Sequence, residues 1–138
     1  MKPAIFILLL LVSDLLTNAQ TDTIPQNSKD SSSCAWLYVY RPKSFVGSAI
    51  GYDLHMDDSV ICRIKNNSKY AIPLVKEGKT EIWAKSEQKV KFVINVKCGK
   101  AYYIKCGIKM GIIVGRPEMS MVAPEQGEVE YESVKGRD

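Results

Sequence analysis

The sequence predicts an all-β fold, a small antiparallel β-sandwich of about seven or eight short strands, after an N-terminal signal peptide. Apolar residues alternate with polar ones in short runs, and turn residues separate these runs at roughly ten-residue intervals. No window after residue 20 has the 3.6-residue period of an amphipathic helix. The chain has 138 residues, 46% of them apolar, which suffices for one core and excludes a collagen-like or low-complexity chain.

Residues 1–19 are expected to be the signal peptide. Lys2 gives a basic start, an apolar run extends from Ala4 to Val12, and cleavage is expected after Ala19. The run is only about half of the roughly 20 residues that span a bilayer, so we expect no transmembrane segment in the mature chain. Cys34 lies too far beyond the run for lipid attachment. Residues 20–34 are expected to form a flexible polar linker.

A single sandwich domain is expected over residues 35–132, with a tail over 133–138. Strands are expected at 35–41, 48–55, 59–65, 70–75, 80–85, 90–97 and 102–109, and further short ones at 111–114, 119–122 and 128–132. Asp57 and Asn67 supply turn chemistry, and Pro73 favours an edge strand or a bulge. This plan is transthyretin-like or immunoglobulin-like.

The clearest hairpin signal lies at residues 90–109. A loop at 98–100 would pair Val96 with Tyr102 and Ile94 with Ile104, so that both apolar faces match. The opposite face would then gather basic residues around one tyrosine. This candidate contact surface comprises Lys91, Lys97, Tyr103, Lys105 and Lys109.

The charge is uneven along the chain. The formal net charge is +4, yet residues 35–114 carry fourteen Lys or Arg against six Asp or Glu, and the segment from residue 115 is acidic. One interpretation is attraction to an anionic envelope component or an envelope protein. The favoured interpretation is that scattered lysines solubilise the strands and protect sheet edges. Export and the lack of a recognition motif argue against a nucleic-acid partner.

Four cysteines in an exported chain allow two disulfides in any of three connectivities. Cys62 and Cys106 both lie on apolar faces, so a bridge between them is one alternative. Two free thiols, packed as small apolar groups, are the other. A catalytic cysteine is disfavoured because His55 is the single imidazole that could serve as its base.

His55 lies between Asp53 and Asp57 at strand spacing, which is compatible with a metal site but is better explained by an exposed hairpin end. The common phosphate-loop, EF-hand and hydrolase motifs are absent. We therefore expect no catalytic residue, no metal ligand and no cofactor. Aromatic residues such as Trp83 and Tyr103 would suit a sugar platform, although cross-strand packing is favoured.

Four segments, taken in their order along the chain, resemble a known family. They are Ala35 to Pro42, Ile61 to Asn66 with Lys69-Tyr70, Glu77-Gly78-Lys79 leading to Ala84, and Gly99 to Ile104. Over about residues 35–110 the chain resembles the bacterial domain-of-unknown-function family numbered 2846. The resemblance implies a small exported all-β domain, often carried by lipoproteins, with no established activity. The turn-strand plan also faintly resembles the PEGA type of surface-associated β domains.

The expected function is that of a non-enzymatic exported β-sandwich module, a binding or structural component at the bacterial cell envelope. Its expected location is periplasmic, associated with the outer envelope, or secreted. The alternative is a small-ligand or carbohydrate-binding domain that uses exposed aromatic residues.

Overall fold

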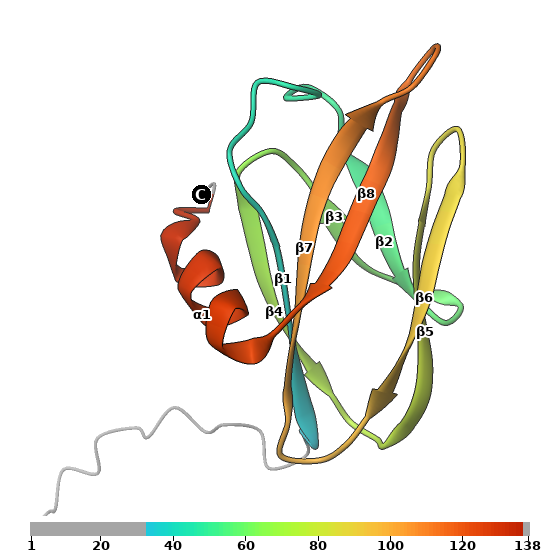
Figure 1. Ribbon diagram of the computed structural model, residues 1–138. Helices are drawn as coiled ribbons and strands as arrows, with labels where there is room; N and C mark the ends of the chain where they lie inside the picture. The colour runs from blue at the N-terminus through green and yellow to red at the C-terminus, as the bar shows by residue number, and fades with distance from the viewer. Residues whose placement is uncertain (1–32, 137–138) are drawn as a thin grey trace, which may run out of the picture.

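The computed structural model describes residues 33–136, which form two packed β-sheets and one helix (Figure 1). The predicted signal peptide, residues 1–19, lies outside the described residues, as does the predicted linker up to residue 32. No helix in the described part of the chain is both long and apolar enough to cross a membrane.

The predicted sandwich of about seven or eight short strands is confirmed, with eight strands in two sheets. The first sheet has the order β4-β1-β7-β8, with β1 at Ala35–Arg41, β4 at Ser68–Leu74, β7 at Ala101–Met110 and β8 at Gly115–Val122. The second sheet has the order β3-β2-β5-β6, with β2 at Tyr52–Met56, β3 at Ser59–Ile64, β5 at Gly78–Lys85 and β6 at Lys89–Val96. Neighbouring strands are antiparallel except for β1 and β7, which run parallel.

The core lies between the two sheets and is built by the alternation that the sequence shows. Leu37 and Val39 of β1 face Leu54 of β2 and Ile82 of β5 in one buried cluster. Pro73 lies on β4, an edge strand, as predicted. Local turn chemistry and burial therefore act together to set the strand boundaries.

The connection between β6 and β7 is not the predicted hairpin. β6 pairs with β5 at the edge of the second sheet, whereas β7 lies between β1 and β8 in the first. Residues 97–100 thus cross between the sheets, and the amide of Trp36 donates to the carbonyl of Lys100 at 3.1 Å. The apolar faces of β6 and β7 meet across the core instead of side by side. The same alternation fits either arrangement.

A disulfide joins Cys34 to Cys98, with their Cα atoms 4.5 Å apart. The amide of Gly99 donates to the carbonyl of Cys34 at 2.7 Å, so the crossing itself brings the two cysteines together. Cys62 and Cys106 are free. The predicted Cys62–Cys106 bridge is therefore wrong, and the alternative of two thiols packed in the core is confirmed.

The helix α1, Pro124–Ser133, replaces the strand that was expected at 128–132. It lies on the outer face of the first sheet (Figure 1). There Tyr40 of β1 and Tyr103 of β7 pack with Val134 in a second apolar cluster. Residues 133–138 were expected to form a tail, but Val134 contributes a buried side chain to this cluster.

The spacing within this helix explains why its pattern is hard to recognise. Gly127, Tyr131 and Val134 recur at helical intervals and face the sheet, but a glycine adds no apolar signal. The predicted strand at 111–114 is also wrong, because these residues form the turn between β7 and β8. The strand expected at 119–122 is the second half of β8.

Gly127→Ala is expected to destabilise the fold by about 1–3 kcal/mol, because the new Cβ would overlap the Cβ and Cγ atoms of Tyr103. At an exposed helix position the same change would stabilise the protein by about 1 kcal/mol. The sign of the change in unfolding free energy therefore shows whether Gly127 packs against Tyr103. Urea denaturation measures the effect. Val129→Ala, on the exposed side of the same helix, is the control and should change stability by less than about 0.5 kcal/mol. A more stable Gly127→Ala protein would contradict this packing.

Candidate functional site

The predicted contact surface is not assembled as one surface. Lys91 lies on β6 and Lys97 follows it, in the second sheet, whereas Lys105 and Lys109 lie on β7 in the first. The outer faces of the two sheets point in opposite directions. Tyr103 is 7% exposed and packs in the cluster beneath α1. The error follows from the crossing between β6 and β7, since the surface required the hairpin.

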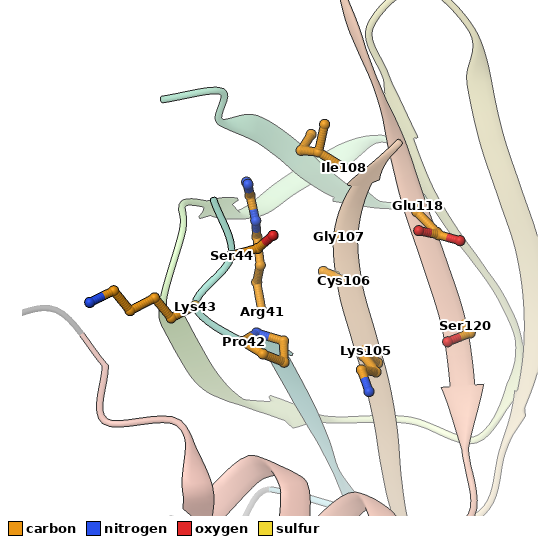
Figure 2. A pocket seen from close by; sticks show the side chains of 10 residues that line it. All are labelled: Arg41, Pro42, Lys43, Ser44, Lys105, Cys106, Gly107, Ile108, Glu118 and Ser120. Carbon is orange, nitrogen blue, oxygen red and sulfur yellow. The ribbon is translucent and has the colours of Figure 1, made fainter. Parts of the chain in front are cut away.

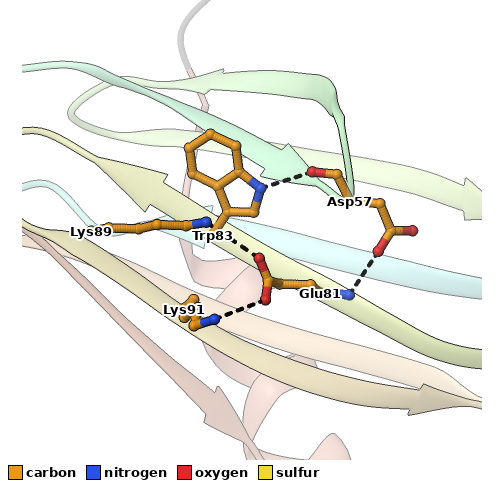
Figure 3. A network of polar contacts seen from close by, with 5 residues as sticks. All are labelled: Asp57, Glu81, Trp83, Lys89 and Lys91. Atoms are coloured by element: carbon orange, nitrogen blue, oxygen red, sulfur yellow. Dashed lines mark hydrogen bonds and ion pairs between the residues drawn. The ribbon is translucent and has the colours of Figure 1, made fainter.

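Trp83 of β5 is held in polar contacts on the outer face of the second sheet (Figure 3). Its Nε1 donates to the carbonyl of Asp57 at 2.8 Å. The ring stacks on His55 of β2 with centroids 3.7 Å apart, and the Nζ atom of Lys89 of β6 lies 4.3 Å from the ring centroid. Since β2 and β6 flank β5, Trp83 is covered from both neighbouring strands. It offers no open platform, and Tyr103 is buried.

The residues around His55 do not converge on a metal position. Asp53 pairs with Arg63 at 2.9 Å, and the Oδ1 atom of Asp57 accepts from the amide of Glu81 at 2.9 Å. Within residues 33–136, one group has metal-ligand spacing: Cys34, Glu77 and Cys98. Its two sulfur atoms are bonded to each other, so neither is a thiolate ligand.

A cleft of about 340 Å³ lies between residues 42–44, which follow β1, and the strands β7 and β8 (Figure 2). This volume is at the small end of the range for small-molecule sites. The polar residues that line it are Arg41, Lys43, Ser44, Lys105, Glu118 and Ser120. The cleft is therefore formed where β1 ends at Pro42, which cannot extend the ladder.

Arg41 is the last residue of β1, and its side chain is buried, with 1% exposed. It occupies an inward position, two residues after Val39. Its Nη1 atom donates to the carbonyl of Ile50 at 2.6 Å, and Nη2 donates to the carbonyl of Gly47 at 2.7 Å. These bonds fasten the segment 42–51, here called the 42–51 loop, over the end of the core.

The charge of Arg41 has no acidic partner within residues 33–136. Its Nε atom is buried without a hydrogen-bond partner. Burial lowers the pKa of the guanidinium, although an arginine stays protonated at neutral pH. The ionisable groups beside it, Tyr52 and Cys106, are neutral because burial raises the pKa of both, that of the Cys106 thiol to about 12. Buried charges are normally paired, whereas the partners of this guanidinium are neutral carbonyl oxygens.

The remaining side chains make the cleft positive overall. Lys43 is exposed and has no ion pair in the described part of the chain, and Lys105 adds a second ammonium group. Glu118 on β8 supplies the opposing charge. The hydroxyls of Ser44 and Ser120 are hydrogen-bond donors. The ammonium group of Lys43 and the two hydroxyls suit a carboxylate or phosphate group, whereas Lys105 is already paired with Glu130.

Glu130 connects the cleft to the helix α1. Its Oε2 atom lies 2.8 Å from the Nζ atom of Lys105 and accepts from the hydroxyl of Tyr40 at 3.0 Å. Gln126 donates to its Oε1 atom at 2.6 Å. The contact with Lys105, followed by those with Gln126 and Tyr40, lowers the pKa of Glu130. This carboxylate therefore holds α1 on the sheet and fixes one wall of the cleft.

The sequence contains a weak signal for this cleft. Arg41 continues the inward positions of Ala35, Leu37 and Val39, and a charged residue at such a position indicates a buried cation. Lys105 and Ser120 lie on β7 and β8, and local sequence patterns do not determine which strands these two pair with. The cleft could therefore be located only once the sheet order was known.

Comparison with known proteins assigns a family. The model of a protein of unknown function (DUF2846) matches residues 31–117. The chain belongs to the DUF2846 family. It is similar to an uncharacterized protein of Haemophilus influenzae, with 29% identity over 109 residues. The match covers 78% of this chain and 64% of that protein, so the chain spans less than two thirds of this relative's length. No solved structure gives a significant match.

The DUF2846 match confirms the resemblance read from the sequence. It covers β1 to β7 and includes three basic residues of the cleft, Arg41, Lys43 and Lys105. Glu118, Ser120 and the helix α1 lie beyond the matched residues. The helix that covers β1 and β7 in this DUF2846 chain is thus outside the matched segment.

Acid is expected to weaken the docking of α1 through Glu130. Because its pKa is lowered in the folded state, ionised Glu130 stabilises the protein above the ordinary value of 4.5, and this contribution is lost as the pH falls through the lower folded value. Glu130→Gln should lower the free energy of unfolding by about 1 kcal/mol at pH 7. Urea titrations should show this difference vanish well below pH 4.5. Glu128→Gln is the control, because Glu128 has no ion pair among residues 33–136. A Glu130→Gln effect that does not change with pH would contradict the role of ionised Glu130 in holding α1.

Proposed function

We propose that this DUF2846 chain is a non-enzymatic binding module of the bacterial cell envelope, and that it holds an anionic group of an envelope component in the Arg41 cleft. The observation that carries the proposal is the buried Arg41 guanidinium, whose partners are neutral and whose Nε atom is unpartnered. Bound carboxylate or phosphate would supply the countercharge.

Two features support an envelope location. Residues 1–19 have the basic start, apolar run and small-residue end of a secretory signal peptide. The Cys34–Cys98 disulfide is of a kind that forms and persists in oxidising compartments such as the periplasm. Both features are independent of the cleft.

The protonation and surroundings of the candidate nucleophiles, two thiols and two hydroxyls, support a role without catalysis. Burial raises the pKa of both Cys62 and Cys106 to about 12, so their thiols stay protonated at neutral pH. His55 is stacked on Trp83 in the second sheet, whereas the cleft lies on the first. Ser44 and Ser120 of the cleft therefore have no imidazole beside them to act as a base.

Carbohydrate binding on Trp83 or Tyr103 has less support. Trp83 is covered by His55 and Lys89, and Tyr103 is buried under α1. Stacking of a sugar would require at least one open ring face.

Inorganic phosphate is expected to raise the melting temperature of the full chain, whereas chloride at equal ionic strength is not, because a ligand of the folded state stabilises it. Lys43→Ala should raise the dissociation constant for phosphate about three- to tenfold, since it removes one charge-assisted contact. A calorimetric temperature scan measures the melting temperature, and titration calorimetry measures the dissociation constant. Lys79→Ala, another exposed lysine without an ion pair in residues 33–136, is the control. Equal stabilisation by chloride, or equal affinity of the two variants, would contradict the cleft assignment.

The exported protein is expected to begin at Gln20 and to carry one disulfide. Peptide mapping of the periplasmic fraction of a bacterial host checks the terminus. Alkylation of the unfolded, unreduced protein should label Cys62 and Cys106 alone, and reduction should add Cys34 and Cys98. Recovery in the cytoplasm with residues 1–19 retained would contradict the proposed location.

A further inference from the structure

An exposed apolar surface lies at the end of the sandwich where the 42–51 loop is found. It comprises Met110 at the end of β7, Ile112, Ile113 and Val114 in the turn that follows, and Phe45, and is here called the apolar tip. Phe45 is 96% exposed, Ile112 is 90% and Ile113 is 89%. The turn and the 42–51 loop lie at the same end of the molecule, and the turn projects beyond the neighbouring strands (Figure 1). Exposed apolar groups of this size mark interaction sites.

The backbone of the tip is held in place, so the exposure is built into the fold. The carboxylate of Glu87, in the turn between β5 and β6, accepts from the amides of Ile113 and Val114 and pairs with Arg116 at 3.2 Å. These amides, followed by Arg116, lower the pKa of Glu87. Gly111 lies so close to Glu87 that a side chain would collide with it. The two isoleucines therefore point outward from a fixed turn.

Three lysines belong to the segments that form or support the tip. Lys109 precedes Met110 at the end of β7, Lys43 lies two residues before Phe45, and Lys85 ends the strand whose turn supplies Glu87. None of these three lysines forms an ion pair in the part of the chain that the structure describes. Glu87 itself is neutralised by Arg116. The tip thus combines projecting apolar side chains with uncompensated positive charge.

We propose that the apolar tip docks on an anionic lipid surface, with Ile112, Ile113 and Phe45 in the interfacial region and the lysines at the headgroups. A bilayer interface accepts isolated, projecting apolar side chains without a shaped pocket, and anionic headgroups complement the lysines. A protein partner would need a groove matched to three separate side chains. The inference relies on the proposed envelope location for its biological setting, but its test uses no property of the Arg41 cleft.

The test measures contact of the tip with lipid by tryptophan quenching. Full-length Ile112→Trp is mixed with vesicles of phosphatidylethanolamine and phosphatidylglycerol whose acyl chains carry bromine. Val93→Trp, an exposed position on the outer face of the second sheet, is the matched control. Quenching is expected at position 112 and not at position 93. It should fall at least about tenfold when Lys85→Glu and Lys109→Glu are combined, or in vesicles of phosphatidylcholine alone.

Three outcomes would overturn the proposal. The first is absence of quenching at position 112, and the second is equal quenching at positions 112 and 93. The third is a dimer in sedimentation experiments that dissociates when Ile112→Ser and Ile113→Ser are combined. The last would make a second copy of the chain the occupant of the tip. Phosphate affinity of the Ser double variant should equal that of the wild type, so failure of this proposal and failure of the cleft assignment are distinguishable.

Discussion

The buried guanidinium of Arg41 is the interaction on which the cleft end of the sandwich depends. Its bonds to the carbonyls of Ile50 and Gly47 keep the 42–51 loop against the core, where Gly47 lies so close to Ile108 that no side chain would fit. The loop in turn forms a wall of the cleft and positions Phe45 at the apolar tip. A lysine at position 41 would keep the charge but lose the planar fork that reaches both carbonyls. The same side chain thus sets the shape of the cleft and its charge.

Two of the segments that carry the DUF2846 resemblance, Ala35 to Pro42 and Gly99 to Ile104, meet in the first sheet. Tyr38 of β1 pairs with Tyr103 of β7, and their rings stack 4.9 Å apart. The hydroxyl of Tyr102 donates to the carbonyl of Asn95 and accepts from the amide of Lys97, which fixes the crossing between the sheets. The Tyr38–Tyr103 contact therefore joins the parallel β1–β7 pair, and Tyr102 joins β7 to the end of β6. Arg41, in the first of the segments, differs because it also faces a cleft.

Strand positions follow from local residues, whereas strand partners depend on distant ones. The alternation around Val39 predicted β1 with its observed bounds, and Pro73 correctly indicated an edge strand. The alternation around Ile94 is the same in a hairpin and in a crossing, so the lysine surface derived from the hairpin was wrong. The helix was not predicted because Gly127 faces the sheet without being apolar. It is suited to that position because its lack of a side chain allows close approach to Tyr103. The cleft was not predicted because Arg41 and its lining residues meet only through the order of the strands.

Arg41 is a buried cation without an acidic partner within residues 33–136, and we propose that it attracts an anion to the cleft. Nuclear magnetic resonance of ¹⁵N-labelled arginine side chains tests this claim most directly. The Nε–Hε signal of Arg41 should exchange slowly with water, because the atom is buried, and should shift as inorganic phosphate is added. The signals of Arg63 and Arg116, which pair with Asp53 and Glu87, should move little. An unchanged Arg41 signal, or equal shifts of all three arginines, would contradict the claim.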